Sequence, residues 1–384
     1  MEIFDYILAG GGAAGLSLAI RLIQTFPNKK ILVLDRAPKR TNDRTWCFWS
    51  VHPSPYPNAT LRTWEKLAFF GTNFSKIFTL SPYRYYLIRG IDFYRYAYDL
   101  LNACPNVRFE YGEIGGIHED ENFASVYING LHFQGEWVFS SLYDPDKIKT
   151  DPKRFHYLKQ HFRGWEIQTG APCFDPQLPT LFDFRTPQKG QMRFMYVLPF
   201  SEREALVEYT LFSPSLLTSE EYDQALEDYI REVLKISEYE IKAVENGIIP
   251  MSDQPLPRQL GKRILAIGTL GGRVKPSSGY AFYRIQKDSD AIIHSLIQNG
   301  HPFDLPQSPA RYRLFDSIML QVMLRHGDEM HRIFTQLFRN NPIQRVFGFL
   351  DEDQTFLQDL KILASLPPFP FIKALLRLKL IGKV

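Results

Sequence analysis

Residues 5–15 read Asp5-Tyr6-Ile7-Leu8-Ala9-Gly10-Gly11-Gly12-Ala13-Ala14-Gly15, and this stretch decides the fold. It begins as a short apolar run typical of a buried parallel strand and then breaks into glycines that satisfy G-x-G-x-x-G. Apolar residues recur at helical spacing over residues 18–23, and a second apolar run over residues 31–34 ends in Asp35. Strand, glycines, helix, strand and acid in this order predict a dinucleotide-binding unit, although a glycine cluster alone is also ordinary turn material.

Each part of this unit has a physical task. Gly10 permits a tight turn, Gly12 leaves room for a pyrophosphate, and Gly15 lets helix and strand pack closely. The helix N-terminus offers free N–H groups to the phosphates, and Asp35, 20 residues after Gly15, can accept hydrogen bonds from a ribose. The residues predicted to bind the cofactor here are Gly10, Gly12, Ala13, Ala14, Gly15, Asp35 and Arg36.

Length and charge limit the classes of protein. At 384 residues the chain is long enough for two domains with their own cores. Its 45 Lys and Arg nearly balance its 42 Asp and Glu, and the net charge of +3 argues against nucleic acid as a partner. The first strand begins almost at residue 1 and no window of 18 apolar residues occurs, so we expect neither a signal peptide nor a spanning helix.

Nothing in the sequence indicates a bound metal. The three cysteines are far apart and form no C-x-x-C pair, which argues against a disulfide framework or a zinc site and fits a reducing cytosol. His326 and His331 flank Asp328 and Glu329 but do not form H-E-x-x-H. A solvated helix face is the simpler interpretation of this cluster.

The hydrophobic pattern predicts an α/β fold. A Rossmann-like cofactor domain is expected to carry an inserted antiparallel β-sheet, which would bind the substrate, and a helical C-terminus. The predicted regions are residues 1–50, 84–152 and 255–305 for the cofactor domain, residues 51–83 and 153–254 for the β-rich substrate domain, and residues 306–384 for the helical region.

Two further segments are expected to approach the cofactor. Residues 42–49 form a dense aromatic stretch around Arg44, which either reaches the cofactor's phosphates or stacks as a surface arginine on Trp46. Residues 268–280 follow a buried-strand pattern, and a helix is predicted to begin near residues 277–278. Such a strand–loop–helix would aim a second helix N-terminus at the cofactor.

The C-terminal tail has an amphipathic pattern. Lys373, Arg377, Lys379 and Lys383 fall on one half of a helix whose other half carries the apolar residues Phe371, Ala374, Leu375, Leu378 and Ile381. A basic amphipathic helix of this kind suits a membrane interface. A terminal helix docked on the protein core has the same pattern, and both interpretations stay open.

Together these motifs resemble one family over nearly the whole chain: the flavin-dependent lycopene β-cyclases of carotenoid biosynthesis, in their bacterial form. The resemblance is carried by residues 10–15, 42–49, 88–90, 160–165, 198–201, 208–210 and 268–280. The family's catalytic segment reads Phe-Leu-Glu-Glu-Thr in plants, and the aligned residues here are Leu206-Val207-Glu208-Tyr209-Thr210. The first glutamate is kept as Glu208, whereas Tyr209 replaces the second acid.

The resemblance implies a flavin hydroxylase-like fold with FAD, active in its reduced form, and NAD(P)H as the reductant. It implies a redox-neutral isomerisation in which each ψ-end of lycopene closes to a β-ionone ring, giving γ-carotene and then β-carotene. The enzyme would be an intramolecular lyase, cytoplasmic and peripherally associated with the membrane that dissolves its substrate. Further cofactor contacts assigned on this basis are Arg44, Arg89, Gly268 and Gly279.

Ring closure needs an acid that protonates the terminal alkene. Glu208, set among Leu206, Val207 and Leu211, is the predicted acid, because burial keeps a carboxyl group protonated to higher pH. The pattern alone also fits a strand glutamate that faces solvent or pairs with Arg203, and only the resemblance favours the acid. Aromatic side chains can stabilise a cation without capturing it. The substrate-pocket candidates are Trp46, Phe194, Tyr196 and Tyr209.

Other functions remain open on the sequence alone. One is an FAD-dependent monooxygenase or prenyl-chain reductase of the same fold superfamily, and another is a non-catalytic flavin-binding membrane protein. Related hydroxylases carry Gly-Asp after the late strand, whereas this chain has Gly268-Thr269, which favours the cyclase branch.

Overall fold

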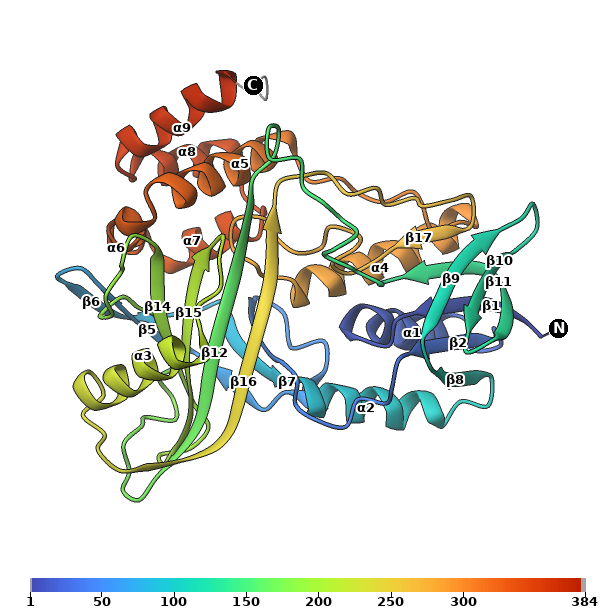
Figure 1. Ribbon diagram of the computed structural model, residues 1–384, viewed down its shortest axis with the longest axis horizontal. Coiled ribbons are helices and arrows are strands. Elements are labelled where there is room, and N and C mark those ends of the chain that lie inside the picture. Colours follow the sequence, from blue (N-terminus) through green and yellow to red (C-terminus); the bar gives the residue numbers. More distant parts are fainter. Residues whose placement is uncertain (1, 381–384) are drawn as a thin grey trace.

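The first β-sheet is built largely from the N-terminal part of the chain. A computed structural model describes residues 2–380, and the strand order of this sheet is β8-β2-β1-β11-β10-β9, with β17 also paired to β11 (Figure 1). The pairs β8–β2, β2–β1, β1–β11 and β11–β17 are parallel, while β9 and β10 extend the sheet as an antiparallel hairpin. The strands are β1 (Ile3–Ala9), β2 (Ile31–Asp35), β8 (Val107–Tyr111), β9 (Ile114–Glu119), β10 (Ala124–Ile128), β11 (Leu131–Ser140) and β17 (Ile264–Ala266).

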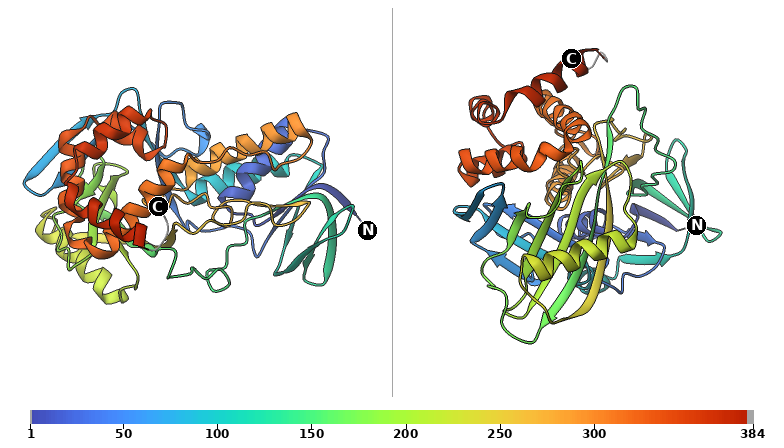
Figure 2. Two further views of the ribbon diagram at one scale, coloured as in Figure 1. Left: turned by 90° about the horizontal axis from the view of Figure 1, so that it is seen from above. Right: turned by 60° about the vertical axis from the view of Figure 1, so that its left-hand side comes forward.

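The second, large sheet has mostly antiparallel strands and lies at the other end of the molecule (Figure 2). Its order is β16-β12-β15-β14-β13-β5-β6, and only β13 and β5 pair in parallel within it. Its strands are β5 (Lys66–Gly71), β6 (Phe74–Thr79), β12 (Tyr157–Thr169), β13 (Thr180–Asp183), β14 (Met192–Pro199), β15 (Glu204–Ser213) and β16 (Tyr239–Ser252). A third, three-stranded sheet has the order β3-β7-β4, with β3 (Thr45–Ser50), β4 (Arg62–Trp64) and β7 (Arg84–Arg89).

Helices cover the sheets and complete the C-terminal region. They are α1 (Ala13–Thr25), η1 (Pro57–Ala59), α2 (Gly90–Asn102), α3 (Ser219–Glu232), α4 (Phe282–Asn299), α5 (Ala310–Arg325), η2 (Gly327–Glu329), α6 (Met330–Asn340), α7 (Ile343–Leu350), α8 (Phe356–Ala364) and α9 (Pro368–Leu380). α1 packs against α4 and α2 beside the first sheet, and α3 covers the outer face of the second sheet (Figure 2). The succession of helices after residue 310 confirms the predicted helical C-terminus.

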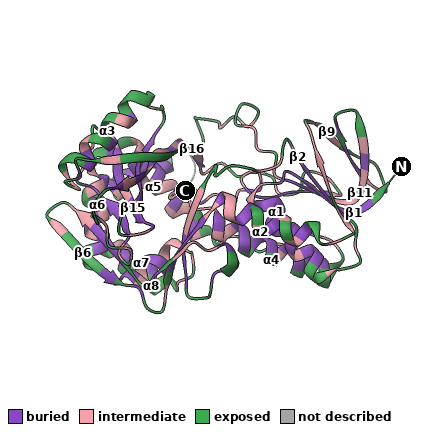
Figure 3. Cartoon of the chain, turned by 90° about the horizontal axis from the view of Figure 1, so that it is seen from below, coloured by how far each residue is buried: buried purple, intermediate pink, exposed green. Residues whose placement is uncertain are grey.

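Local sequence explains where these elements begin and end. Strands β1 and β2 are almost wholly buried, as their apolar runs require (Figure 3). α3 starts with a capping box, in which Thr218 Oγ1 accepts a hydrogen bond from Glu221 N and Glu221 Oε2 accepts one from Thr218 N. α4 ends at Asn299 and is capped by Gly300, whose φ of +70° is the left-handed conformation that glycine adopts without strain.

The predicted start of α4 near residues 277–278 is wrong. The helix begins at Phe282, because the chain first closes a turn in which the Lys275 carbonyl accepts hydrogen bonds from Ser278 N and Gly279 N. Gly279 then takes a φ of +73°, outside the right-handed helical region. The loop between β17 and α4 is therefore longer than the sequence pattern indicates.

The C-terminal tail docks on the protein. Ala374 and Leu378, from the predicted apolar stripe, are buried, and α9 packs against α5. Ile381 and Lys383 lie outside the described residues. Within residues 2–380 no helix is both long and apolar enough to cross a bilayer. The division of the chain into the predicted cofactor, substrate and helical domains stays a prediction.

Candidate active site

A cleft of about 590 Å³ brings together residues from distant parts of the sequence. One wall comes from the glycine turn before α1, another from the start of β3, a third from the loop between β17 and α4, and the fourth from the large sheet. The predicted site residues that line it are Gly12, Ala13, Ala14, Arg44, Trp46, Tyr196, Glu208, Gly268 and Gly279. The sequence-predicted cofactor turn and the predicted acid therefore face one cavity.

The glycine turn leaves a cradle at the N-terminus of α1. Gly10 has a φ of +118°, which a residue with a side chain rarely adopts. A Cβ at Gly15 would clash with the carbonyl oxygen of Gly10, whereas a Cβ at Gly12 would meet nothing within 4 Å. Gly10 and Gly15 thus shape the turn, and Gly12 keeps the space in front of it open. A pyrophosphate fits this arrangement of free N–H groups and open space.

Asp35 lies where the end of β2 meets this turn. Its Oδ1 accepts a hydrogen bond from Arg36 N at 2.7 Å, and its Oδ2 accepts none from any described residue, although Lys39 Nζ is 3.4 Å away. A Cβ at Gly11 would lie 3.0 Å from that oxygen, so the carboxylate sits directly beside the turn. A free carboxylate oxygen at this position suits a ribose hydroxyl, as the sequence predicts.

Two predicted cofactor contacts lie away from the cleft. Arg89 precedes α2 and forms an ion pair with Asp92, with Nε and Oδ2 2.7 Å apart. Arg36 has an exposed side chain and does not line the cleft. Arg44 does line it, from an exposed position at the start of β3.

Glu208 occupies the deep side of the cleft, in the middle of the large sheet. It lies opposite Tyr196 on β14 and opposite Gly164 on β12, and its side chain is 9% exposed. Its Oε1 accepts a hydrogen bond from Thr210 Oγ1 at 2.7 Å. The alternative of a solvent-facing glutamate is excluded by this burial, and Arg203 instead donates to the carbonyl of Gly170.

A second buried carboxylate, Glu245, lies level with Glu208 across the sheet. Gly164 pairs with Glu208 on one side and with Glu245 on the other, so the side chains of the two glutamates point to the same face of the sheet. A Cβ at Gly164 would come within 2.9 Å of Leu206 Cδ1 and 3.3 Å of Glu208 Cβ. The absence of a side chain at Gly164 therefore leaves room for the two glutamates on this face of the sheet.

The surroundings favour the protonated form of Glu208. Burial, reinforced by the nearby charge of Glu245, raises the pKa of Glu208 to about 8. Burial also raises the pKa of Glu245, but two hydrogen bonds oppose this shift, from Thr45 N at 2.9 Å and from Thr45 Oγ1 at 2.6 Å. Because Glu245 has two donors that stabilise its charge, Glu208 is the member of the pair that keeps a proton at neutral pH.

Neutral aromatic rings complete the deep end of the cleft. Tyr85, Tyr196 and Tyr280 line it together with Cys47, and burial raises the pKa of every one of these groups. The phenols and the thiol therefore stay uncharged at physiological pH. Their ring faces provide electron density beside Glu208 without supplying an anion that would attack a cation.

Two predicted pocket residues do not reach the cleft. Tyr209 follows Glu208 along β15 and so points to the opposite face, where it packs under α3 and accepts a hydrogen bond from Arg193 Nη1 at 2.9 Å. Phe194 shares the face of Glu208 but packs inside the core against Phe182, with ring centroids 4.8 Å apart. Contrary to the prediction, Tyr209 and Phe194 therefore do not line the cleft.

Sequence reasoning missed Glu245, Tyr85 and Tyr280. Glu245 stands in a strand of mixed polarity, and no local pattern shows that a glycine 81 positions earlier lies beside it in the sheet. Tyr280 belongs to the segment that carried the family resemblance, yet only the fold turns its ring toward Glu208. Among residues 2–380 no group of three or more His, Cys, Asp or Glu is arranged to hold a metal ion.

Comparison with known proteins identifies the family of the chain. A family model described as "Lycopene cyclase protein" matches residues 5–376. The lycopene beta-cyclase of Pseudescherichia vulneris is 24% identical over 394 residues, and the match covers 96% of each chain. The chloroplastic lycopene beta cyclase of Arabidopsis thaliana is 22% identical over 320 residues, which are 77% of this chain but only 61% of the plant protein.

The fold is that of flavin-dependent enzymes. HpxO from Klebsiella pneumoniae, solved in complex with FAD, superposes with a TM-score of 0.62 at 12% identity, covering 95% of this chain and 100% of that one. This likeness confirms the predicted flavin hydroxylase-like α/β architecture.

Proposed function

The chain belongs to the lycopene cyclase family, and from that premise we propose that it is a lycopene β-cyclase that closes the ψ-ends of lycopene to β-ionone rings. The observation that carries the proposal is a buried glutamic acid, Glu208, whose pKa is raised to about 8 and which lies in the same cleft as the glycine turn. The reaction is an isomerisation, so substrate and product differ only in where bonds and one proton lie. One closure gives γ-carotene, and the second gives β-carotene.

Glu208 is the proposed general acid. Its carboxyl group transfers its proton to the terminal alkene of a ψ-end, which leaves a tertiary carbocation. The neighbouring double bond of the substrate attacks that cation and forms the ring. The Glu208 carboxylate then accepts a ring proton, which sets the ring double bond and restores the acid.

Glu245 has a supporting part in this proposal. Two carboxylates close together in a buried site do not both ionise easily, so one charge on Glu245 keeps the proton on Glu208. Glu245 also accepts both Thr45 hydrogen bonds, which join the start of β3 to the large sheet. The Glu245 side chain thus raises the pKa of Glu208 and also fixes the start of β3, which lines the cleft.

The cleft also protects a cation from water. Tyr196 lies directly opposite Glu208 on the neighbouring strand, and Tyr85 and Tyr280 are buried beside it. Their faces stabilise positive charge, and their bulk excludes the water that would convert the cation to an alcohol.

FAD is the proposed cofactor. Gly12, Ala13 and Ala14 would hold its pyrophosphate, Asp35 its adenosine ribose, and the loop from Gly268 to Gly279 its ring end. When bound and reduced, the flavin ring supplies negative charge beside the developing cation. NAD(P)H is the proposed reductant, and no electrons are consumed in the net reaction.

Membrane association is proposed from the surface of the last two helices. Phe369, Ile372 and Leu376 of α9 are exposed, as are Phe356, Leu357 and Leu360 of α8. Basic side chains at 373, 377 and 379 lie among the exposed residues of α9. A hydrocarbon substrate dissolves in lipid, so an apolar surface with flanking positive charge would bring the protein to it.

The main alternative is a monooxygenase or prenyl-chain reductase. These would consume NADPH stoichiometrically, and a monooxygenase would need oxygen. The test is to express the chain in bacteria that accumulate lycopene, identify the pigment, and then repeat the reaction anaerobically with dithionite-reduced protein. We expect β-carotene without oxygen and without added NADPH. An oxygenated or hydrogenated carotenoid would overturn the assignment.

A further inference from the structure

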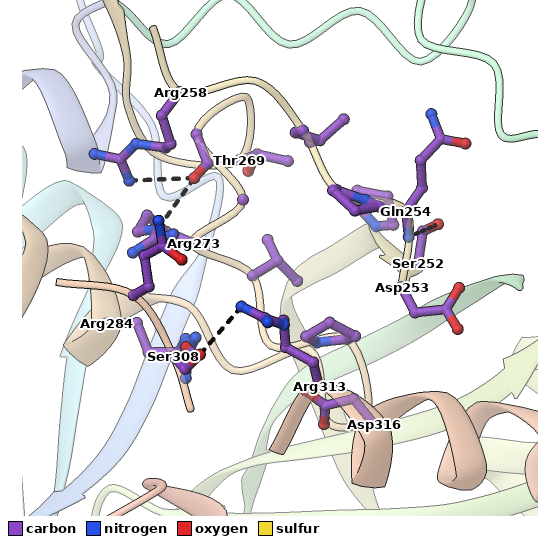
Figure 4. A pocket seen from close by; sticks show the side chains of 18 of the residues that line it. Ser252, Asp253, Gln254, Arg258, Thr269, Arg273, Arg284, Ser308, Arg313 and Asp316 are labelled. Carbon is purple, nitrogen blue, oxygen red and sulfur yellow. Dashed lines mark hydrogen bonds between the residues drawn. The ribbon is translucent and has the colours of Figure 1, made fainter. Parts of the chain in front are cut away.

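A second cavity of about 740 Å³ lies on the other side of the loop that follows β17 (Figure 4). It is larger than the cleft, and most of its lining residues do not line the cleft. The two spaces share a wall, because both are lined by Tyr143, Tyr157, Pro250, Thr269 and Val274. A molecule in the second cavity would therefore lie next to the ring end of the proposed flavin site.

Four arginines from separate segments line this cavity: Arg258, Arg273, Arg284 and Arg313. Arg258 and Arg273 share one carboxylate, Asp288, at 2.9 and 3.4 Å. Two guanidinium groups on a single, nearly buried carboxylate leave positive charge uncompensated. In agreement, burial lowers the pKa of Arg273 to about 10, an effect strengthened by the charge of Arg258.

Of the remaining arginines of the cavity, Arg284 is balanced by neighbouring carboxylates, whereas Arg313 is not. Arg284 shares Glu352 with Lys275, at 3.1 and 2.8 Å, and Lys275 also pairs with Asp316. Arg313 forms no ion pair with the part of the chain described here, and its guanidinium donates a hydrogen bond to the carbonyl of Ser308 at 3.3 Å. A further carboxylate on the wall, Asp253, bonds His156 and points away from the arginines (Figure 4).

The arginine donors also converge. Arg258 Nη1 and Arg273 Nε both donate to the carbonyl of Gly271, at 3.2 and 3.1 Å (Figure 4). Arg258 Nε and Arg284 Nε are buried and have no hydrogen-bond partner within residues 2–380. A guanidinium fork matches the oxygens of a phosphate, so a convergent set of arginines suits a phosphate group.

We propose that this cavity binds the phosphates of the nicotinamide dinucleotide that reduces the flavin. The inference rests on the proposed function, because only a flavin enzyme that works in its reduced state requires a reductant here. Arg258, Arg273 and Arg313 would contact the pyrophosphate, and the shared wall would let the nicotinamide approach the cleft at Thr269. In the step itself, the C4–H bond of the nicotinamide breaks and its hydrogen moves with both electrons to oxidised FAD. NAD(P)⁺ leaves, and the flavin holds the two electrons.

The test measures flavin reduction separately from cyclisation. Purified wild type, Arg313→Gln and Arg273→Gln are mixed anaerobically with NADPH or NADH, and loss of the oxidised-flavin absorbance is followed against nucleotide concentration. Each variant loses at least one charge-assisted hydrogen bond to the nucleotide, so the apparent Kd should rise at least about tenfold. Arg325→Gln, an equal charge change at an exposed position on the same helix, is the matched control and should leave the Kd unchanged.

A binding readout and a chemical bypass make the result decisive. NADPH titrated into the oxidised protein should quench tryptophan fluorescence, inorganic pyrophosphate should compete, and the Arg313→Gln variant should lose both effects. The ratio of NADPH-driven to dithionite-driven cyclisation should fall at least about tenfold in that variant. If Arg313→Gln binds NADPH as the wild type does, or if phosphatidylglycerol vesicles rather than nucleotides compete with pyrophosphate, the nicotinamide site is disproved. Dithionite-driven cyclisation tests only the proposed function, so its outcome does not depend on the nicotinamide site.

Discussion

Glu208 and Glu245 lie level with each other on one face of the large sheet, with Gly164 between them. The arrangement brings together two buried carboxylates 37 positions apart in sequence, and Glu208 lines the cleft. Burial raises the pKa of both, and the hydrogen bonds from Thr45 favour charge on Glu245. The pair therefore favours one proton, on Glu208, and one negative charge, on Glu245.

Replacing Glu208 with Gln should remove the acid and keep the shape of the site. We expect lycopene cyclisation to fall by about 10²–10⁴-fold, the usual contribution of a general acid, while FAD binding persists. Glu204→Gln is the control, because Glu204 lies on the same strand at its less buried end. Carotenoid product measured by chromatography gives the rates, and normal cyclisation by Glu208→Gln would rule Glu208 out as the acid.

The activity should depend on pH through the proton on Glu208. Because the pKa of this carboxyl is raised to about 8, the acid form predominates below that pH and is lost above it. The rate should therefore be nearly constant at neutral pH and fall as the pH rises through about 8. A rate that instead rises with pH across this range would contradict the acid role.

The same raised pKa affects stability. Between the ordinary glutamate pKa and about 8, the folded protein retains a proton that the unfolded chain has released, so the free energy of unfolding falls as the pH rises through this window. Glu208→Gln lacks this proton and should not show that part of the decline. Urea unfolding of both proteins at pH 5 and pH 8.5 would give the change in the free energy of unfolding for each. An equal change in the two proteins would contradict the prediction.

Glu245→Gln tests the tuning of the acid. Removal of the like charge should lower the pKa of Glu208, so the alkaline limb of the rate profile should move to lower pH. Burial remains the larger cause of the raised pKa, so the limb should not reach the ordinary glutamate range. Glu245→Asp keeps the charge and should restore much of the profile, whereas a purely structural role would lower the rate equally at every pH.

Two glycines in the cofactor turn should respond differently to alanine. Gly12→Ala adds a methyl group that meets no atom within 4 Å, so the protein should fold with an unchanged melting temperature but bind FAD more weakly. Gly15→Ala drives a methyl group into the Gly10 carbonyl and should cost about 1–3 kcal/mol of stability. Thermal unfolding and flavin absorbance of the purified proteins separate the two effects. Equal FAD content in Gly12→Ala and wild type would argue against a pyrophosphate at this turn.

The exposed apolar surface of α8 and α9 should mediate membrane binding. Ile372→Ser combined with Leu376→Ser should reduce flotation with anionic vesicles without lowering stability, because both side chains are largely exposed. Leu378→Ser, on the buried side of the same helix, should instead lower the free energy of unfolding. Unchanged flotation of the double variant would contradict a membrane role for this surface.

The sequence predicts those parts of the molecule whose determinants are close together in the chain. The strand, glycines, helix and acid of residues 5–35 determine one another locally, and the predicted turn is found at the cleft. The start of α4 was mispredicted, because Ser277 looks like an N-cap while hydrogen bonds to the Lys275 carbonyl hold the chain in a turn. The role of Glu245 could not be predicted, because its position beside Glu208 depends on strand pairing across β12 that no local pattern encodes.

The pleat of β15 has a consequence for relatives that carry two acids at the positions of Glu208 and Tyr209. Neighbours along a strand face opposite ways, and here position 209 looks toward α3. In any relative that keeps this register, one carboxylate of such a pair would meet the carotenoid and the other would lie behind the sheet. The two acids of such a motif would therefore have separate roles. Replacement of the acid at position 209 would leave the proton donor at position 208 in place.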